Sequence, residues 1–133
     1  MKKSLFLTLM LIANGVVFAA TDHYVLRDNN HVQHLKITTL ADEVRVSADV
    51  DFEPNADEAG KTPCTADIAG EAKKEGNNTL VMKRQMEGER HFCTLKIELS
   101  PKGAKIEQSQ DCSYFAAGIC RFDSKGKELI KVQ

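Results

Sequence analysis

The chain has 133 residues, of which 42% are hydrophobic and 28% are charged, and its formal net charge is −1. This length favours a single domain. The balanced charge excludes the basic surface that nucleic-acid-binding proteins carry.

The first 19 residues have the composition of a secretory signal peptide. Lys2 and Lys3 form a positive start, residues 5–17 are mostly apolar, and small residues precede a cleavage site after Ala19. The apolar segment is shorter than the roughly 20 residues of a membrane-spanning helix. Removing two lysines from the 18 basic residues leaves 16 against 19 acidic ones, a net charge of −3. We expect an exported bacterial protein of about 114 residues, periplasmic or secreted, with no transmembrane segment.

Seven short segments of the mature chain predict β-strands. The clearest is 43–52, where Val44, Val46, Ala48, Val50 and Phe52 alternate with polar residues. The others are 35–40, 64–72, 79–85, 91–99, 104–109 and 129–132, and turn residues separate them. The pattern predicts one all-β domain over residues 20–133, a small antiparallel sandwich or barrel of about seven strands.

The segment 53–63 interrupts this alternation with the sequence EPNADEAGKTP. Its prolines, glycine and acidic residues predict a surface loop. Such a loop can steer towards a basic partner, so Asp57 and Glu58 are candidate partner contacts.

Four cysteines follow the predicted cleavage site: Cys64, Cys93, Cys112 and Cys120. An even number of cysteines in a small exported chain predicts a disulfide framework. Neighbouring strands lie about 4.8 Å apart, and a bridge needs Cα atoms within roughly 7 Å. In a meander this favours Cys93–Cys112 together with Cys64–Cys120, although the sequence leaves the other two pairings open.

The stretch between the last two cysteines contains two aromatic residues, Tyr114 and Phe115. On a loop held by disulfides they can form an anchor for a protein partner, because a stapled loop loses little entropy on binding. The alternative is that both rings plug the open end of the sheet.

Catalytic and metal-binding motifs are weak in this sequence. There is no G-x-S-x-G motif, so we expect no catalytic residue, no enzyme and no cofactor. His31 and His34 are three residues apart, which places them on opposite faces of a strand. Met82 is expected in the core and Met86 in a turn. A metal- or small-ligand-binding envelope protein that uses these histidines and methionines is the alternative function.

Three motifs carry a resemblance to small exported bacterial β proteins, some of which are lysozyme inhibitors. They are C-x-A-x-x-x-G-x-A from Cys64, C-T-L-K-I from Cys93, and DCSYFAAGICRFD from Asp111. The serine-glycine inhibitory loop of the c-type lysozyme inhibitor family is absent, so no inhibitory residue is transferred. The resemblance implies a non-enzymatic periplasmic binding protein, an inhibitor of or immunity protein against a basic cell-wall hydrolase or toxin.

Overall fold

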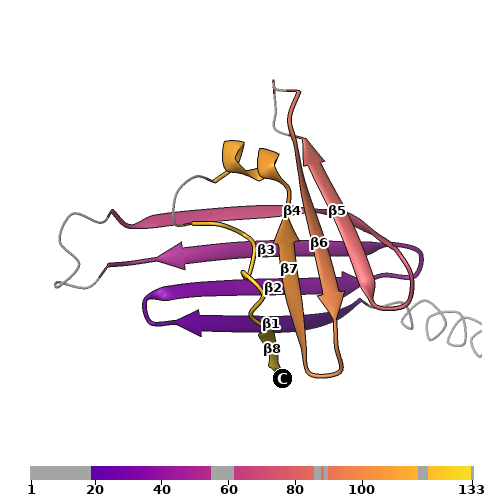
Figure 1. The fold of residues 1–133 in the computed structure, drawn as a ribbon. Helices are drawn as coiled ribbons and strands as arrows, with labels where there is room; N and C mark the ends of the chain where they lie inside the picture. The colour runs from indigo at the N-terminus through magenta and orange to yellow at the C-terminus, as the bar shows by residue number, and fades with distance from the viewer. Residues whose placement is uncertain (1–18, 55–61, 86–87, 89, 117–119, 133) are drawn as a thin grey trace, which may run out of the picture.

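The computed structural model describes residues 19–54, 62–85, 88, 90–116 and 120–132. Within these ranges the chain forms an all-β, closed antiparallel barrel, as the alternation predicts (Figure 1). Its elements in chain order are β1 (Ala20–Asp28), β2 (His31–Thr39), β3 (Val44–Phe52), β4 (Cys64–Lys74), β5 (Thr79–Gln85), β6 (Phe92–Leu99), β7 (Gly103–Gln108), the short 3₁₀ helix η1 (Gln110–Tyr114) and β8 (Leu129–Val132). No described helix is long and apolar enough to cross a bilayer.

Each strand pairs with the next along the chain, and β8 returns to β1 to close the barrel. In Figure 1 β1–β4 run across the view, and β5–β7 cross them steeply. The pairings β1–β2, β2–β3 and β3–β4 each extend over nine residue pairs. By contrast, β4–β5 and β1–β8 share three pairs each, and β7–β8 shares two. The barrel is therefore a broad four-stranded sheet joined to a smaller one by narrow seams.

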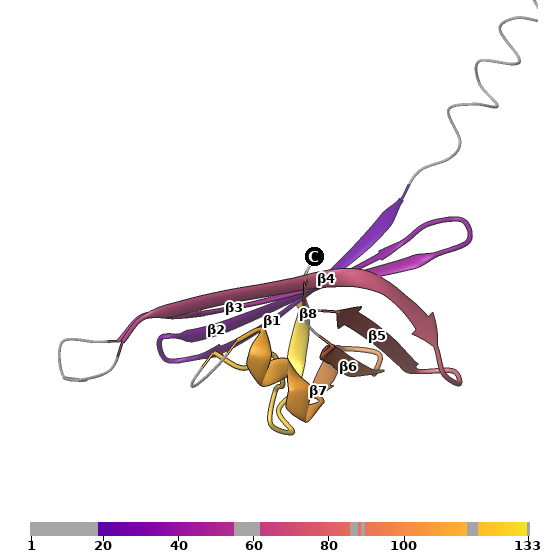
Figure 2. The same ribbon diagram turned by 90° about the horizontal axis from the view of Figure 1, so that it is seen from above.

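The strand β4 turns the chain from one sheet to the other. It pairs with β3 through residues 64–72 and with β5 only through its last three residues. Figure 2 shows its strong curvature. An added Cβ at Gly70 of this strand would be 3.3 Å from the sulfur of Met82 in β5. Glycine therefore lets β5 approach closely here.

The inner faces of the strands form one core, as their alternation predicts. Its fully buried side chains include Leu35, Val46, Val50, Met82, Leu95, Ile97, Ile106, Phe122 and Leu129. The expected core position of Met82 is thus confirmed, and Met86 lies outside the described residues.

The structure has one strand more than the sequence analysis predicts. The additional strand is β1, and β2 begins at His31 rather than at Leu35. Only Tyr24 is buried in β1, and polar residues occupy both of its faces. Its strand conformation therefore comes from pairing with β2 and β8, which a test for alternation cannot detect.

Both disulfides have the pairing that the strand geometry favours. Cys64 bonds to Cys120 and Cys93 to Cys112, with Cα–Cα distances of 6.2 and 4.3 Å. Two bridges and no free cysteine in the described chain are consistent with an oxidising compartment outside the cytoplasm.

Candidate functional site

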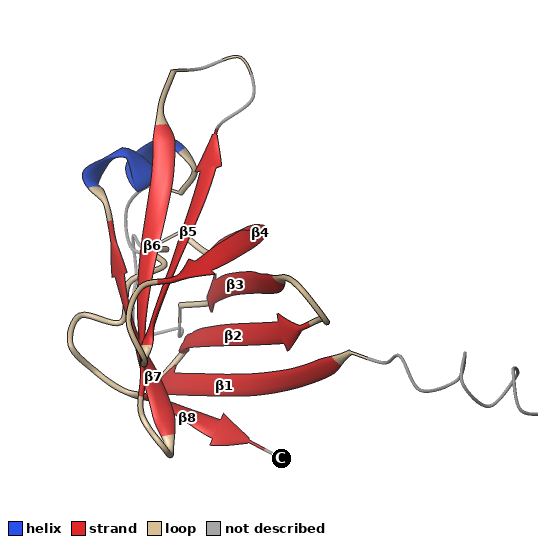
Figure 3. Ribbon diagram, turned by 90° about the vertical axis from the view of Figure 1, so that its right-hand side faces the viewer, coloured by secondary structure: helices blue, strands red, loops and turns tan. Residues whose placement is uncertain are grey.

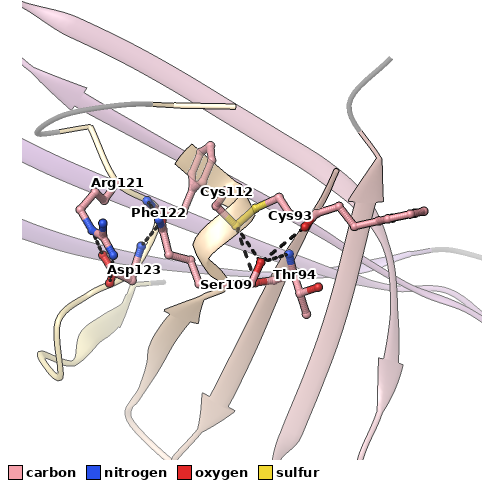
Figure 4. The surroundings of a disulfide bond; sticks show 9 residues. Cys93, Thr94, Ser109, Cys112, Arg121, Phe122 and Asp123 are labelled. Carbon is pink, nitrogen blue, oxygen red and sulfur yellow. Dashed lines mark hydrogen bonds and ion pairs between the residues drawn. A yellow bond between two sulfur atoms is a disulfide. The ribbon is translucent and has the colours of Figure 1, made fainter. Parts of the chain in front are cut away.

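The connection from β7 to β8 passes through η1, and we call its described residues 109–116 and 120–124 the crossing segment. Its first part is fixed to β6 by the Cys93–Cys112 disulfide (Figure 4). Ser109 adds two bonds to Thr94: its backbone N–H donates to the Thr94 carbonyl at 2.9 Å, and its Oγ accepts from the Thr94 N–H at 3.0 Å. This end of the segment is therefore held by one covalent and two polar links.

The second part of the crossing segment is fixed by the buried side chain of Gln33 and the partly buried side chain of Gln108. The amide of Gln33 donates to the carbonyl oxygens of residues 121 and 123 at 3.1 and 2.7 Å. The Gln108 side-chain oxygen accepts the Phe122 N–H at 2.7 Å. The ring of Phe122 is buried in the core, so the segment closes this part of the barrel.

An ion pair stiffens the same part of the segment. Arg121 donates to both carboxylate oxygens of Asp123, at 3.0 and 2.9 Å. The hydrogen bond to Asp123 raises the pKa of the Arg121 guanidinium, which stays charged in any case. Figure 4 shows this pair beside the backbone of Phe122. Its geometry is bidentate, the arrangement that best fixes a guanidinium.

The crossing segment presents one stacked aromatic pair to solvent. The ring of Tyr114 lies parallel to that of His91, with centroids 3.8 Å apart and planes at 11°. Tyr114 is 49% exposed, so about half of its surface is accessible for contacts. Asp111 lies 3.5 Å from Nδ1 of His91, within ion-pair distance when that imidazole is protonated. We call His91, Asp111 and Tyr114 the stacked surface.

The two aromatic residues that the sequence analysis singles out have different environments. Phe115 is partly buried and packs against the core, as expected for a plug. Tyr114 is not part of that core and lies on the surface. The contact of His91 with Tyr114 is not predictable from sequence patterns, because it depends on the Cys93–Cys112 bridge, which brings η1 to the start of β6.

The acidic loop lies mostly outside the described residues, and Asp57 and Glu58 are among those not described. Cys64, the residue that directly follows this loop in the chain, forms a disulfide with Cys120 of the crossing segment. The described end of the acidic loop is therefore covalently attached to the segment that carries Tyr114.

The histidines considered for metal binding lie on opposite faces of β2, as their spacing predicts. His31 lies on the inner side, with its ring centroid 6.3 Å from that of Phe52. His34 lies on the outer side and contacts His23 of β1. This His–His contact is not predicted from the sequence, because β1 is not predicted as a strand. Among the described residues, no three potential ligands converge as a metal site.

A surface hollow of about 410 Å³ lies between β4 and β5. Its lining consists of Glu71, Lys73, Lys74, Glu75, Val81 and Lys83. Charges of both signs surround one aliphatic residue, whereas small-molecule sites are predominantly apolar. This hollow therefore differs in its lining from a typical small-molecule site.

Comparison with known proteins gives no match to a family model, to a curated protein or to a solved structure.

Proposed function

We propose that this protein is a periplasmic, non-enzymatic binding protein that holds a protein partner through the stacked surface. The observation that carries the proposal is a half-exposed tyrosine on a segment held by disulfides at Cys112 and Cys120. The sharpest form of the proposal is an inhibitor of, or immunity protein against, a basic cell-wall-degrading enzyme or toxin.

Rigidity of the crossing segment supports this proposal. Binding normally costs conformational entropy at each side chain and loop that becomes ordered. Here Tyr114 stacks on His91 before any partner arrives, and η1 is already bonded to β6. Tyrosine is enriched among residues that dominate binding energies, because it combines large apolar area with a polar group.

Charge and compartment support the choice of partner. The mature chain has a predicted net charge of −3 and an acidic loop attached through Cys64 to the crossing segment. Complementary charge accelerates association with a basic partner. An exported chain with two disulfides meets such partners in the cell envelope.

Affinity capture with the oxidised mature protein tests the proposal. Envelope extract and a panel of basic muramidases, amidases and cell-wall-active toxins are passed over the immobilised protein, and enzyme activity is assayed with it in solution. We expect at least one such protein to be retained and slowed. Tyr114→Ala should weaken that complex by about 30-fold or more, the loss typical of an interface hot spot above 2 kcal/mol.

The matched control is Ile130→Ala, which removes another exposed apolar side chain, 52% exposed, from β8. It should leave capture unchanged. If the panel yields no retained or slowed enzyme, the inhibitor proposal is wrong. If both variants bind like the wild type, the partner uses a different surface.

A further inference from the structure

Two imidazoles meet on the outer face of the broad sheet, far in sequence from the crossing segment. His23 of β1 is opposite Lys36 of β2, and His34 is opposite Val25, so the two histidines are diagonal neighbours. On the other side, His34 is directly opposite Asp49 of β3. Cross-strand neighbours on one face are close enough for their side chains to interact.

The ring nitrogens are spaced like two ligands of one metal ion. Nε2 of His23 lies 2.9 Å from Nδ1 of His34, and the rings are stacked with centroids 5.1 Å apart. This spacing is that of a hydrogen bond, and it keeps both nitrogens close enough for one ion to bond to each at about 2.0–2.1 Å once the rings turn.

The rings can turn to point both lone pairs at one ion. Both histidines are only partly buried, and χ2 of histidine is a broad torsion with a low cost for rotation. The shared N–H···N hydrogen bond holds the two nitrogens together until a metal replaces it. The strands on either side fix the backbone, because His23 and His34 lie inside a ladder of nine residue pairs.

One charge of each sign lies next to the pair, because Lys36 is opposite His23 and Asp49 is opposite His34. Asp49 supplies negative charge next to the site, which favours a divalent cation.

We propose that His23 and His34 form a binding site for a divalent copper ion, with water completing the coordination. Nitrogen ligands bind Cu(II) more tightly than Ni(II) or Zn(II), so copper is the expected occupant. The proposal is independent of the stacked surface and of its partner.

Copper titration of the oxidised mature protein tests this site, with Cu²⁺ itself as the probe. We expect one equivalent of Cu(II), with an electron paramagnetic resonance spectrum that shows coupling to two imidazole nitrogens. His23→Gln and His34→Gln should each weaken binding by at least about ten-fold, because each leaves a single imidazole. His31→Gln, on the inner side of the same strand as His34, is the matched control and should bind like the wild type.

The rival site is the amino terminus that cleavage after Ala19 would create, three residues before His23. A variant with several additional N-terminal residues distinguishes the two sites. The extension moves the free amino group away from His23, whereas the His23–His34 pair needs His34 and no free amine. Retained binding by the extended form, and its loss in extended His34→Gln, support the proposal. The proposal is overturned if the wild type binds no copper, if His34→Gln binds normally, or if the extension abolishes binding.

Discussion

Gln33 is the residue that connects the broad sheet with the crossing segment. It is 2% exposed, and its amide nitrogen lies within hydrogen-bond distance of three successive carbonyl oxygens, those of residues 121–123. These carbonyls belong to irregular backbone, so no strand ladder satisfies them. A buried carbonyl oxygen without a hydrogen-bond donor destabilises the folded state. The single amide group of Gln33 supplies donors to these neighbouring carbonyl oxygens.

Replacing Gln33 by leucine should therefore lower the free energy of unfolding by about 1–3 kcal/mol, although leucine fills similar space. Urea unfolding with linear extrapolation measures the change. The matched control is Gln110→Leu on the exposed side of η1, which should stay within about 0.5 kcal/mol of the wild type. Equal stability of Gln33→Leu and the control would show that water satisfies the carbonyls just as well.

At the scale of elements, the two disulfides have different structural roles. Cys93–Cys112 closes a span of 19 residues and attaches η1 directly to β6. Cys64–Cys120 closes a span of 56 residues and joins the broad sheet to the second half of the crossing segment. The longer span restricts the unfolded chain more, whereas the shorter one positions the stacked surface.

Removing each bridge in turn by a double cysteine-to-alanine substitution should distinguish these two roles. The chain-entropy model gives a loss of about 4 kcal/mol for Cys64–Cys120 and about 3 kcal/mol for Cys93–Cys112. The amides of Phe115 and Ala116, which both donate to the Cys112 carbonyl, should lose hydrogen-exchange protection selectively without the shorter bridge. Urea unfolding and amide exchange measure the two effects. Protected amides in that variant would mean that packing of Phe115 alone holds η1.

The elements also show what sequence patterns can predict. Strands with a clean apolar face, such as β3 and β6, are predicted because their inner residues alternate with polar ones. The disulfide pairing follows from strand neighbourhood and is confirmed. β1 and the His23–His34 pair are not predictable in this way, because they depend on the register between strands rather than on composition. The contact of His91 with Tyr114 likewise depends on where η1 is attached.

At the scale of the whole molecule, closure of the barrel depends on β8, the shortest of the described strands. β8 has four residues and pairs with β1 through three and with β7 through two (Figure 3). Gly103 allows the β7–β8 contact, because a Cβ at this position would overlap the Leu129 carbonyl oxygen. The central strand β3 is instead paired over nine residues on both sides. Strand pairing is thus strongest in the broad sheet and weakest at the seam.

Native-state hydrogen exchange should therefore show two levels of protection. The amides of β3 should exchange only through global unfolding, while those of β8 should exchange through a smaller opening at lower free energy. Gly103→Ala should widen this difference, because overpacking at the seam costs about 1–3 kcal/mol. Lys105→Ala on the exposed side of β7 is the matched control and should leave both levels unchanged. If β8 and β3 share one exchange free energy in the wild type, the barrel opens as a single cooperative unit and the seam has no separate stability.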